Sequence, residues 1–281
     1  MSELSYSEVY VISSELVTPH MRRITFGGPG LAGFRPLAPD QQVKLFFSRD
    51  GGRPEVPLPP PDGDKMRWYQ SFMAVPEERR PWMRTYSVRR HLADRQQVEI
   101  DFVMHGENGG DGPASSWAAA ARAGAMIGLL GPAISHFRTA EPGTSKLFVG
   151  DETALPAMAA WVESLPAGER AVVFAEVVDA REEQSWEPLA DVTVNWVHRG
   201  DRPHGPDLLV EAVRAAELPP GPVFAWLAGE ASTVRALRRH LVDERGLEKR
   251  SVAFTGYWRA NMTQDEPPTA AELEDHADVL P

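Results

Sequence analysis

Four consecutive residues, Arg84-Thr85-Tyr86-Ser87, bring a guanidinium, an aromatic ring and a small hydroxyl onto one segment with the alternation of a strand. A guanidinium can bind a phosphate in fork geometry, and a tyrosine ring offers a flat apolar face to an isoalloxazine. The Ser87 hydroxyl can reach the flavin nitrogen that accepts hydride. The segment therefore indicates a flavin site, with an ordinary strand as the alternative for these four residues taken alone.

A turn into a predicted helix at Gly112-Pro113-Ala114-Ser115 provides a second place for phosphate. Backbone N–H groups at a helix N-terminus have no intrahelical partner and bind anions such as a pyrophosphate. A plain N-cap by Ser115 is the alternative, and the two can hold together. Because FMN would leave this second phosphate site partly empty, the two segments together favour tight, noncovalent FAD.

The stretch Gly150-Asp151-Glu152-Thr153-Ala154 follows a predicted strand and opens a predicted helix. In an open α/β sheet a mononucleotide lies at such a place, outside the carboxyl end of a strand. The stretch lacks a Gly-x-Gly-x-x-Gly pattern, and its two carboxylates are unfavourable for close phosphate contact. A capped turn between strand and helix is therefore the alternative to a nucleotide site.

Three further side chains are candidates because of where they stand. His105 follows a strand and precedes the Gly-rich turn, although its residue type alone favours a surface histidine. Lys44 lies inside an apolar strand, so its side chain faces outward or into a cavity at the mouth of a barrel. Arg259 ends the last predicted strand after two aromatic residues, which would place it at the mouth of the site.

The composition excludes several classes of protein. The chain has 281 residues, no cysteine and a formal charge of −11. Without cysteine there is no disulfide, thiol catalysis or Cys-ligated metal. The histidines form no His-Glu-x-x-His pattern, so we expect no dedicated metal site. The acidic charge makes nucleic acid and anionic membranes poor partners. The sequence has neither an apolar run of about 18 residues nor a secretory signal, so we expect a cytoplasmic protein, and a monomer.

Two patterns of secondary structure divide the chain. Short runs rich in β-formers precede residue 140, at residues 9–12, 21–26, 42–47, 84–90, 97–104 and 126–130. With one helix they predict a small antiparallel barrel, interrupted by a Pro-rich excursion without steady periodicity at residues 53–81. Later strands and helices alternate, which predicts a parallel sheet covered on both faces. We place the domains at residues 1–140 and 141–260, before an acidic tail at residues 261–281.

These motifs together resemble the siderophore-interacting proteins, a family of flavin-dependent ferric-siderophore reductases within the ferredoxin–NADP reductase superfamily. The resemblance covers residues 9–259. Two stretches are specific to that family: Gly-Asp-Glu-Thr-Ala-Leu-Pro at residues 150–156 and Gly-Tyr-Trp-Arg at residues 256–259. The stretches at residues 84–89, 101–106 and 112–115 are shared more widely in the superfamily.

The resemblance implies a six-stranded antiparallel FAD-binding barrel followed by a parallel-sheet nicotinamide-binding domain. It implies that residues 84–87, His105 and the turn at residues 112–115 hold FAD, and that residues 150–154 face the nicotinamide nucleotide. Lys44 and Arg259 match basic positions that hold the anionic ferric siderophore in the family. In the family, another basic residue and a glycine often follow the Gly-Tyr-Trp-Arg stretch. Here Ala260-Asn261-Met262 follow it, so we expect a less basic pocket.

The expected function is electron transfer from NADH or NADPH through FAD to an Fe(III)-siderophore, with Ser87 at the reacting flavin. Siderophore oxygens suit Fe(III), and the softer Fe(II) is held far less tightly. The alternatives are a general flavin reductase with a protein or diffusible acceptor, and a non-catalytic carrier, against which the complete motif set argues. Among the charged residues of the stretch 175–183, acids outnumber the single base, Arg181, which alone could bind a 2′-phosphate there, and this favours NADH.

Overall fold

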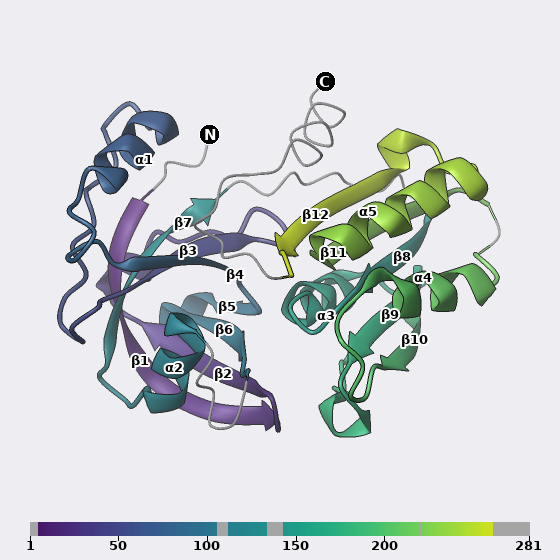
Figure 1. Cartoon of the computed structure of the whole chain (residues 1–281), viewed down its shortest axis with the longest axis horizontal. Helices are drawn as coiled ribbons and strands as arrows, with labels where there is room; N and C mark the ends of the chain where they lie inside the picture. The colour runs from purple at the N-terminus through teal and green to yellow at the C-terminus, as the bar shows by residue number, and fades with distance from the viewer. Residues whose placement is uncertain (1–4, 106–111, 134–142, 220, 261–281) are drawn as a thin grey trace.

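A computed structural model describes residues 5–105, 112–133, 143–219 and 221–260 of the chain. Figure 1 shows two lobes, a curled antiparallel sheet in the purple-to-teal half and a parallel sheet with flanking helices in the teal-to-yellow half. The predicted boundary near residue 140 and the tail at residues 261–281 lie outside the described residues. The domain limits therefore stay predictions.

The antiparallel sheet has seven strands in the order β4-β3-β7-β1-β2-β6-β5. Their bounds are β1 (Ser5–Thr18), β2 (Met21–Gly27), β3 (Gln42–Phe47), β4 (Trp82–Ser87), β5 (Arg90–Leu92), β6 (Gln97–Val103) and β7 (Met126–Ala133). The expected number of six strands was wrong by one. The predicted strand at residues 84–90 divides into β4 and the short β5.

The division of that strand curls the sheet. β4 and β5 form its two opposite edges, yet only Val88 and Arg89 separate them. The Val88 amide donates to the Gln41 carbonyl before β3 at 2.7 Å, whereas the Arg89 amide donates to the Glu99 carbonyl of β6 at 2.9 Å. The chain thus leaves one edge and joins the other within two residues, which requires the edges to approach each other. The antiparallel barrel is confirmed in this coarser form.

The excursion at residues 53–81 contains a helix that the sequence analysis did not predict. α1 (Lys65–Met73) begins after Asp64, whose side chain accepts two backbone N–H groups of the first turn. Trp68 and Phe72 pack on Phe46 of β3, with ring centroids 6.1 Å and 5.6 Å away. Because the helix buries only these two residues, its apolar pattern is too short to indicate a helix.

The second sheet has the order β10-β9-β8-β11-β12, and its neighbouring strands are all parallel, as predicted. Its strands are β8 (Ser145–Gly150), β9 (Arg170–Val177), β10 (Asp191–His198), β11 (Val223–Glu230) and β12 (Val252–Trp258). Its helices are α3 (Leu155–Ser164), α4 (Pro206–Ala215) and α5 (Ala231–Arg239). Among the described residues, no helix combines the length and apolarity needed to cross a membrane.

Helices cover both faces of the parallel sheet. Phe148 of β8 belongs to one apolar cluster with α3, whereas its neighbours Leu147 and Val149 belong to another with α4 and α5. Since the strands are parallel, their carboxyl ends meet at one edge of the sheet. Figure 1 shows β12 ending beside the barrel, so this edge is where the two lobes can share a site.

Candidate functional site

The side chains of the predicted flavin motif alternate between two faces of β4. Tyr86 lies opposite Val43 and Arg84 opposite Leu45, and both partners are fully buried in the barrel core. The Tyr86 ring packs against Phe102 of β6, with centroids 4.5 Å apart and planes tilted by 41°. Burial raises the pKa of the Tyr86 hydroxyl, which therefore stays protonated at neutral pH. Tyr86 is thus a fixed, uncharged wall of the barrel.

The other face of β4 turns toward the parallel sheet. Ser87 is buried, and its hydroxyl lies 3.4 Å from the Tyr257 hydroxyl of β12. On the same face, Lys44 of β3 lies opposite Thr85 and donates to its hydroxyl at 3.3 Å. Burial lowers the pKa of Lys44, because a charged ammonium loses hydration there.

A second contact holds β11 and β12 at this place. Trp226 donates its indole N–H to Asp40, which precedes β3, at 3.1 Å in a buried position. Tyr257 meets the edge of the Trp226 ring at 6.3 Å and 82°. Burial raises the pKa of the Tyr257 hydroxyl, so a neutral phenol faces Ser87. These aromatic residues pack between the lobes.

The helix α2 (Pro113–Ala120) has Gly112 as its N-cap residue, and no side chain caps its first turn. Ser115 is not the N-cap, because its hydroxyl instead donates to the Gly112 carbonyl at 3.2 Å. The alternative interpretation of this turn as a plain Ser115 cap was therefore wrong. The first-turn N–H groups of Ala114 and Ser115 have no side-chain acceptor from a cap, which fits a bound pyrophosphate. His105 is exposed just beyond β6.

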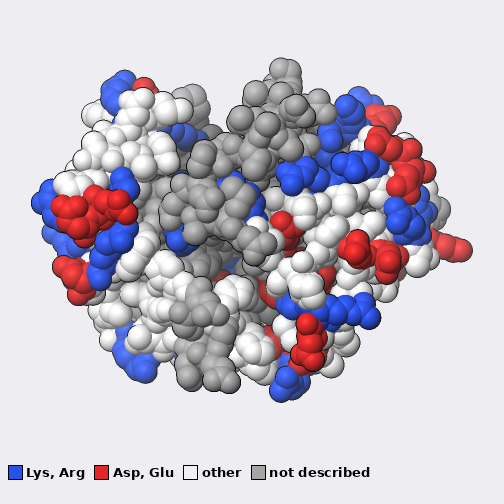
Figure 2. Space-filling view, in the orientation of Figure 1, with Lys and Arg blue, Asp and Glu red and all other residues white. Residues whose placement is uncertain are grey.

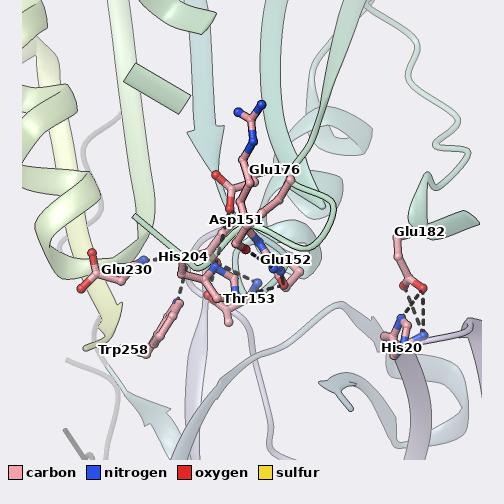
Figure 3. A network of polar contacts seen from close by, with 11 residues as sticks. His20, Asp151, Glu152, Thr153, Glu176, Glu182, His204, Glu230 and Trp258 are labelled. Carbon is pink, nitrogen blue, oxygen red and sulfur yellow. Dashed lines mark hydrogen bonds and ion pairs between the residues drawn. The ribbon is translucent and has the colours of Figure 1, made fainter. Parts of the chain in front are cut away.

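Asp151 lies at the carboxyl end of β8 and turns inward (Figure 3). Its carboxylate accepts from the Thr153 amide at 2.9 Å, the Thr153 hydroxyl at 2.6 Å, and the Glu230 amide and Trp258 indole N–H at 2.8 Å each. Burial raises the pKa of Asp151, while these donors oppose the shift. Asp151 therefore ties the ends of β8, β11 and β12 together and does not present its charge to a ligand.

The second acidic residue of this stretch, Glu152, is paired with a cation of the same lobe. Glu152 accepts from Arg199 at 2.7 Å, and the same guanidinium contacts Glu176 at the end of β9 at 3.1 Å. His204 lies 3.6 Å from each of these carboxylates. Burial lowers the pKa of His204, but Glu176 and Glu152 outweigh it and raise the pKa. Of the two carboxylates that seemed unfavourable for phosphate, Glu152 is thus paired with a cation, and Asp151 accepts only from neutral donors.

Glu152, Glu176 and His204 also have the atoms to bind a metal ion, since one ligand atom of each lies within 4.8 Å of the others. Arg199 contacts both carboxylates and supplies a positive charge at that point. The arrangement is accordingly an ion-pair network at the carboxyl edge of the parallel sheet. The sequence prediction of no metal site is left untested.

Two family models cover most of the chain. The model of the siderophore-interacting FAD-binding domain matches residues 10–136, and that of the siderophore-interacting protein matches residues 144–261. The chain belongs to the siderophore-interacting protein family. The resemblance drawn from the motifs is thereby confirmed in both halves, and the expected FAD agrees with the FAD-binding domain that the first model describes.

Relatives with named activities are similar to this member of the family over nearly its full length. Ferric vibriobactin reductase ViuB of Vibrio cholerae is 28% identical over 256 residues, 90% of this chain and 89% of that protein. NADPH-dependent ferric-chelate reductase of Escherichia coli is 26% identical over 264 residues, 92% and 95% respectively. The crystal structure of a siderophore utilization protein from T. fusca is 33% identical, covers 95% of this chain and 97% of that one, and has a TM-score of 0.79.

The sequence motifs supplied candidate residues on both sheets, at β4 and at the end of β8, but did not include the ion-pair network. Arg199 and His204 follow β10 and were not predicted, and Glu176 was noted only as part of an acidic stretch. A glutamate inside the apolar β9 is a signal for a buried partner. Which cation would meet it could not be known before the strand order placed β10 beside β9.

Proposed function

We propose that the chain is a ferric-siderophore reductase, which passes electrons from NADH or NADPH through FAD to an Fe(III)-siderophore and so releases iron as Fe(II). The observation that carries the proposal is the meeting of the two sheets at Ser87, where the last hydroxyl of the flavin motif lies 3.4 Å from Tyr257 of β12. The names of the ferric reductase relatives support the same activity. A monomeric state and a cytoplasmic location stay predictions.

The chain's own groups would hold FAD at separate points along its length. Arg84 and the first turn of α2 would bind its phosphates, Tyr86 would give its ring an apolar wall, and Ser87 would orient the hydride-accepting nitrogen, with Thr85 and His105 nearby. Bound FAD supplies the change from a two-electron donor to a one-electron acceptor, because nicotinamide gives electrons in pairs and iron takes one. The nucleotide would lie at residues 150–154, at the carboxyl edge of the sheet.

Two cations from different lobes approach the Ser87 end of β4. Lys44 is two residues beyond Gln42, which pairs with Ser87, and Arg259 is two residues beyond Tyr257. Two residues of strand span only about 6.6 Å, so both side chains can reach a chelate beside the flavin. Figure 2 shows basic and acidic side chains interspersed on both lobes. Attraction of an anionic chelate therefore depends on local cations, and we infer that Lys44 and Arg259 provide them.

We expect the Lys44→Ala, Arg259→Ala double variant to bind an anionic ferric siderophore more weakly while keeping its FAD and its quinone-dependent oxidation of nicotinamide. An ion pair with the chelate that stays exposed to solvent should contribute roughly 1 kcal/mol or less because water screens it, and the deficit from such a pair should shrink as salt rises. Steady-state kinetics at two salt concentrations measure this. The Lys65→Ala, Arg79→Ala variant, with the same charge change on the excursion, is the control.

If the double variant reduces the ferric siderophore as well as the wild type at low salt, the pocket lies elsewhere. We would then test His136 and Arg138, two basic residues that follow Gly131-Pro132 in the sequence and lie outside the described residues.

Ser87→Ala should keep FAD but slow its reduction by NADH or NADPH by roughly one to two orders of magnitude, the range of one lost transition-state hydrogen bond. Anaerobic stopped-flow absorbance measures the rate, and reduction by dithionite shows that the flavin itself remains competent. An unchanged rate with the nicotinamide would show that Ser87 only packs against Tyr257.

Nicotinamide oxidation with and without ferric chelate separates this function from its alternatives. A ferric-siderophore reductase oxidises the nucleotide faster when the chelate is added, a general flavin reductase responds equally to unrelated acceptors, and a carrier oxidises none. The same assay compares NADH with NADPH. The structure engages Arg181 in a fork with Asp179, with N···O distances of 3.0 Å and 2.7 Å, so we expect NADH to be preferred.

A further inference from the structure

A single carboxylate of the second lobe contacts the turn of the barrel between β1 and β2. Glu182, just beyond β9, accepts from the Thr18 hydroxyl at 2.5 Å and from the His20 amide at 3.1 Å and 3.2 Å. The His20 ring nitrogen Nδ1 lies 2.8 Å from the same carboxylate. Figure 3 shows Glu182 reaching this histidine. The Glu182 side chain is only 8% exposed, so the contact is a buried, multiply bonded tie between the lobes.

Beside this tie the seam contains both an apolar contact and a cavity, since Met21 of β2 is buried in the apolar cluster that includes α3. A cavity of about 350 Å³ opens there, lined by both lobes, with Arg23 and Thr18 on one side and Gln184 and Trp186 on the other. At another point of the cavity wall, the Arg89 guanidinium of the barrel donates two hydrogen bonds to the Glu163 carboxylate of α3, at 2.7 Å and 2.6 Å. Polar ties thus join the lobes around this cavity, beside the apolar contact of Met21.

The position of Glu182 in the chain links the tie to the nucleotide edge. Glu182 lies six residues after Glu176, and Glu176 is bound by Arg199 in the ion-pair network at the end of β9. One short segment, residues 176–182, thus belongs at its start to the carboxyl edge of the parallel sheet, where the nucleotide is proposed to lie, and contacts the barrel at its end. A change in the tie would move that edge relative to β4, which carries the flavin motif.

We propose that Glu182 is a positioning residue for hydride transfer: by binding Thr18 and His20 it fixes the distance between the nicotinamide edge and the flavin strand. The inference rests on the proposed function, since it requires FAD on the barrel and a nicotinamide on the parallel sheet. Hydride transfer needs reacting atoms about 3–3.5 Å apart, and a misplacement of about 1 Å can cost ~10²-fold in rate. A tie far from the reacting atoms can therefore control the rate without touching the substrate.

The test compares Glu182→Ala with Glu183→Ala in the FAD-loaded protein. Glu183 is the adjacent acid on the same loop, but it pairs with His198 of its own lobe at 2.8 Å, so the variant makes the same charge change without loosening the seam. We expect Glu182→Ala to lower the rate of flavin reduction and kcat by about 10-fold or more. KM for the nucleotide should change less than 3-fold. The long-wavelength absorbance of stacked nicotinamide and flavin should weaken, while Glu183→Ala behaves as the wild type.

A second variant keeps the test decisive if Glu182→Ala does not fold or retain FAD. Thr18→Val removes one donor from the barrel side with almost no change of shape, and we expect it to slow flavin reduction in the same direction. If a folded Glu182→Ala protein reduces its flavin at the wild-type rate, the positioning role is overturned and the proposed function is not. If Glu182→Ala does not fold, a wild-type rate in Thr18→Val has the same meaning. A wild-type protein whose FAD neither NADH nor NADPH reduces would instead refute the proposed function.

Discussion

Asp151→Ala should lower the free energy of unfolding by roughly 3–5 kcal/mol, because several buried donors lose the same acceptor at once. The variant leaves the Thr153 amide and hydroxyl, the Glu230 amide and the Trp258 indole N–H without their common acceptor. Buried donors without partners keep their full desolvation cost. Urea unfolding followed by tryptophan fluorescence measures the change, and nucleotide affinity should fall with it because three strand ends lose their tie.

Asp179→Ala is the matched control for this variant. Asp179 also follows a strand and accepts the amide two residues later, but it does so at the exposed surface. We expect little change in stability there. Equal stability of Asp151→Ala and wild type would show that the ends of β8, β11 and β12 are held by other contacts.

Arg84→Ala should weaken FAD binding by roughly 1.5–3 kcal/mol, the loss expected for one charge-assisted hydrogen bond, or about 10- to 150-fold in Kd. Arg84 lies on the core-facing side of β4, and its guanidinium donates to the Met83 carbonyl at 2.8 Å. This contact fixes the side chain on the barrel before a phosphate is bound. Titration of the apoprotein with FAD, followed by quenching of flavin fluorescence, gives the affinity.

Arg80→Ala is the control for the loss of an arginine, since Arg80 donates to the Met73 carbonyl at 2.9 Å outside the motif. Its FAD affinity should match that of the wild type. Equal affinity of the Arg84→Ala protein would remove Arg84 from the flavin site. Wild-type protein that retains FMN and no FAD would contradict the assignment of the α2 N-terminus to a second phosphate.

Local patterns were sufficient to predict most elements of the fold. The apolar runs of β3 and β6, the alternation from β8 to β12 and the turn at Gly112 depend on neighbouring residues, so the sequence displays them directly. The break between β4 and β5 does not, because Val88 continues the apolar alternation while its amide bonds to Gln41. A strand that changes its pairing partner keeps its pattern, and only the three-dimensional pairing shows the change.

The sequence could indicate a candidate site only where one segment carries all its groups, as at residues 84–87 and 150–154, and the roles of these residues stay predictions. The site was not predictable where partners come from distant segments. Arg199 meets Glu152 across 47 residues, and Thr18 meets Glu182 across 164. Charged residues of this kind are common on solvated surfaces, and no pattern in the sequence distinguishes those that pair in the interior. Strand order and interdomain packing decide these contacts.

One anaerobic measurement tests the central claim most directly. The purified protein with bound FAD is reduced by one equivalent of NADH or NADPH and mixed with the ferric complex of 2,3-dihydroxybenzoate, an anionic catecholate, in the presence of a coloured Fe(II) trap. We predict that the flavin absorbance returns while about two Fe(II) are trapped per FAD, since the reduced flavin carries two electrons and each iron takes one. A flavin that stays reduced, with no Fe(II) trapped, would contradict the assignment of this protein as a ferric-siderophore reductase.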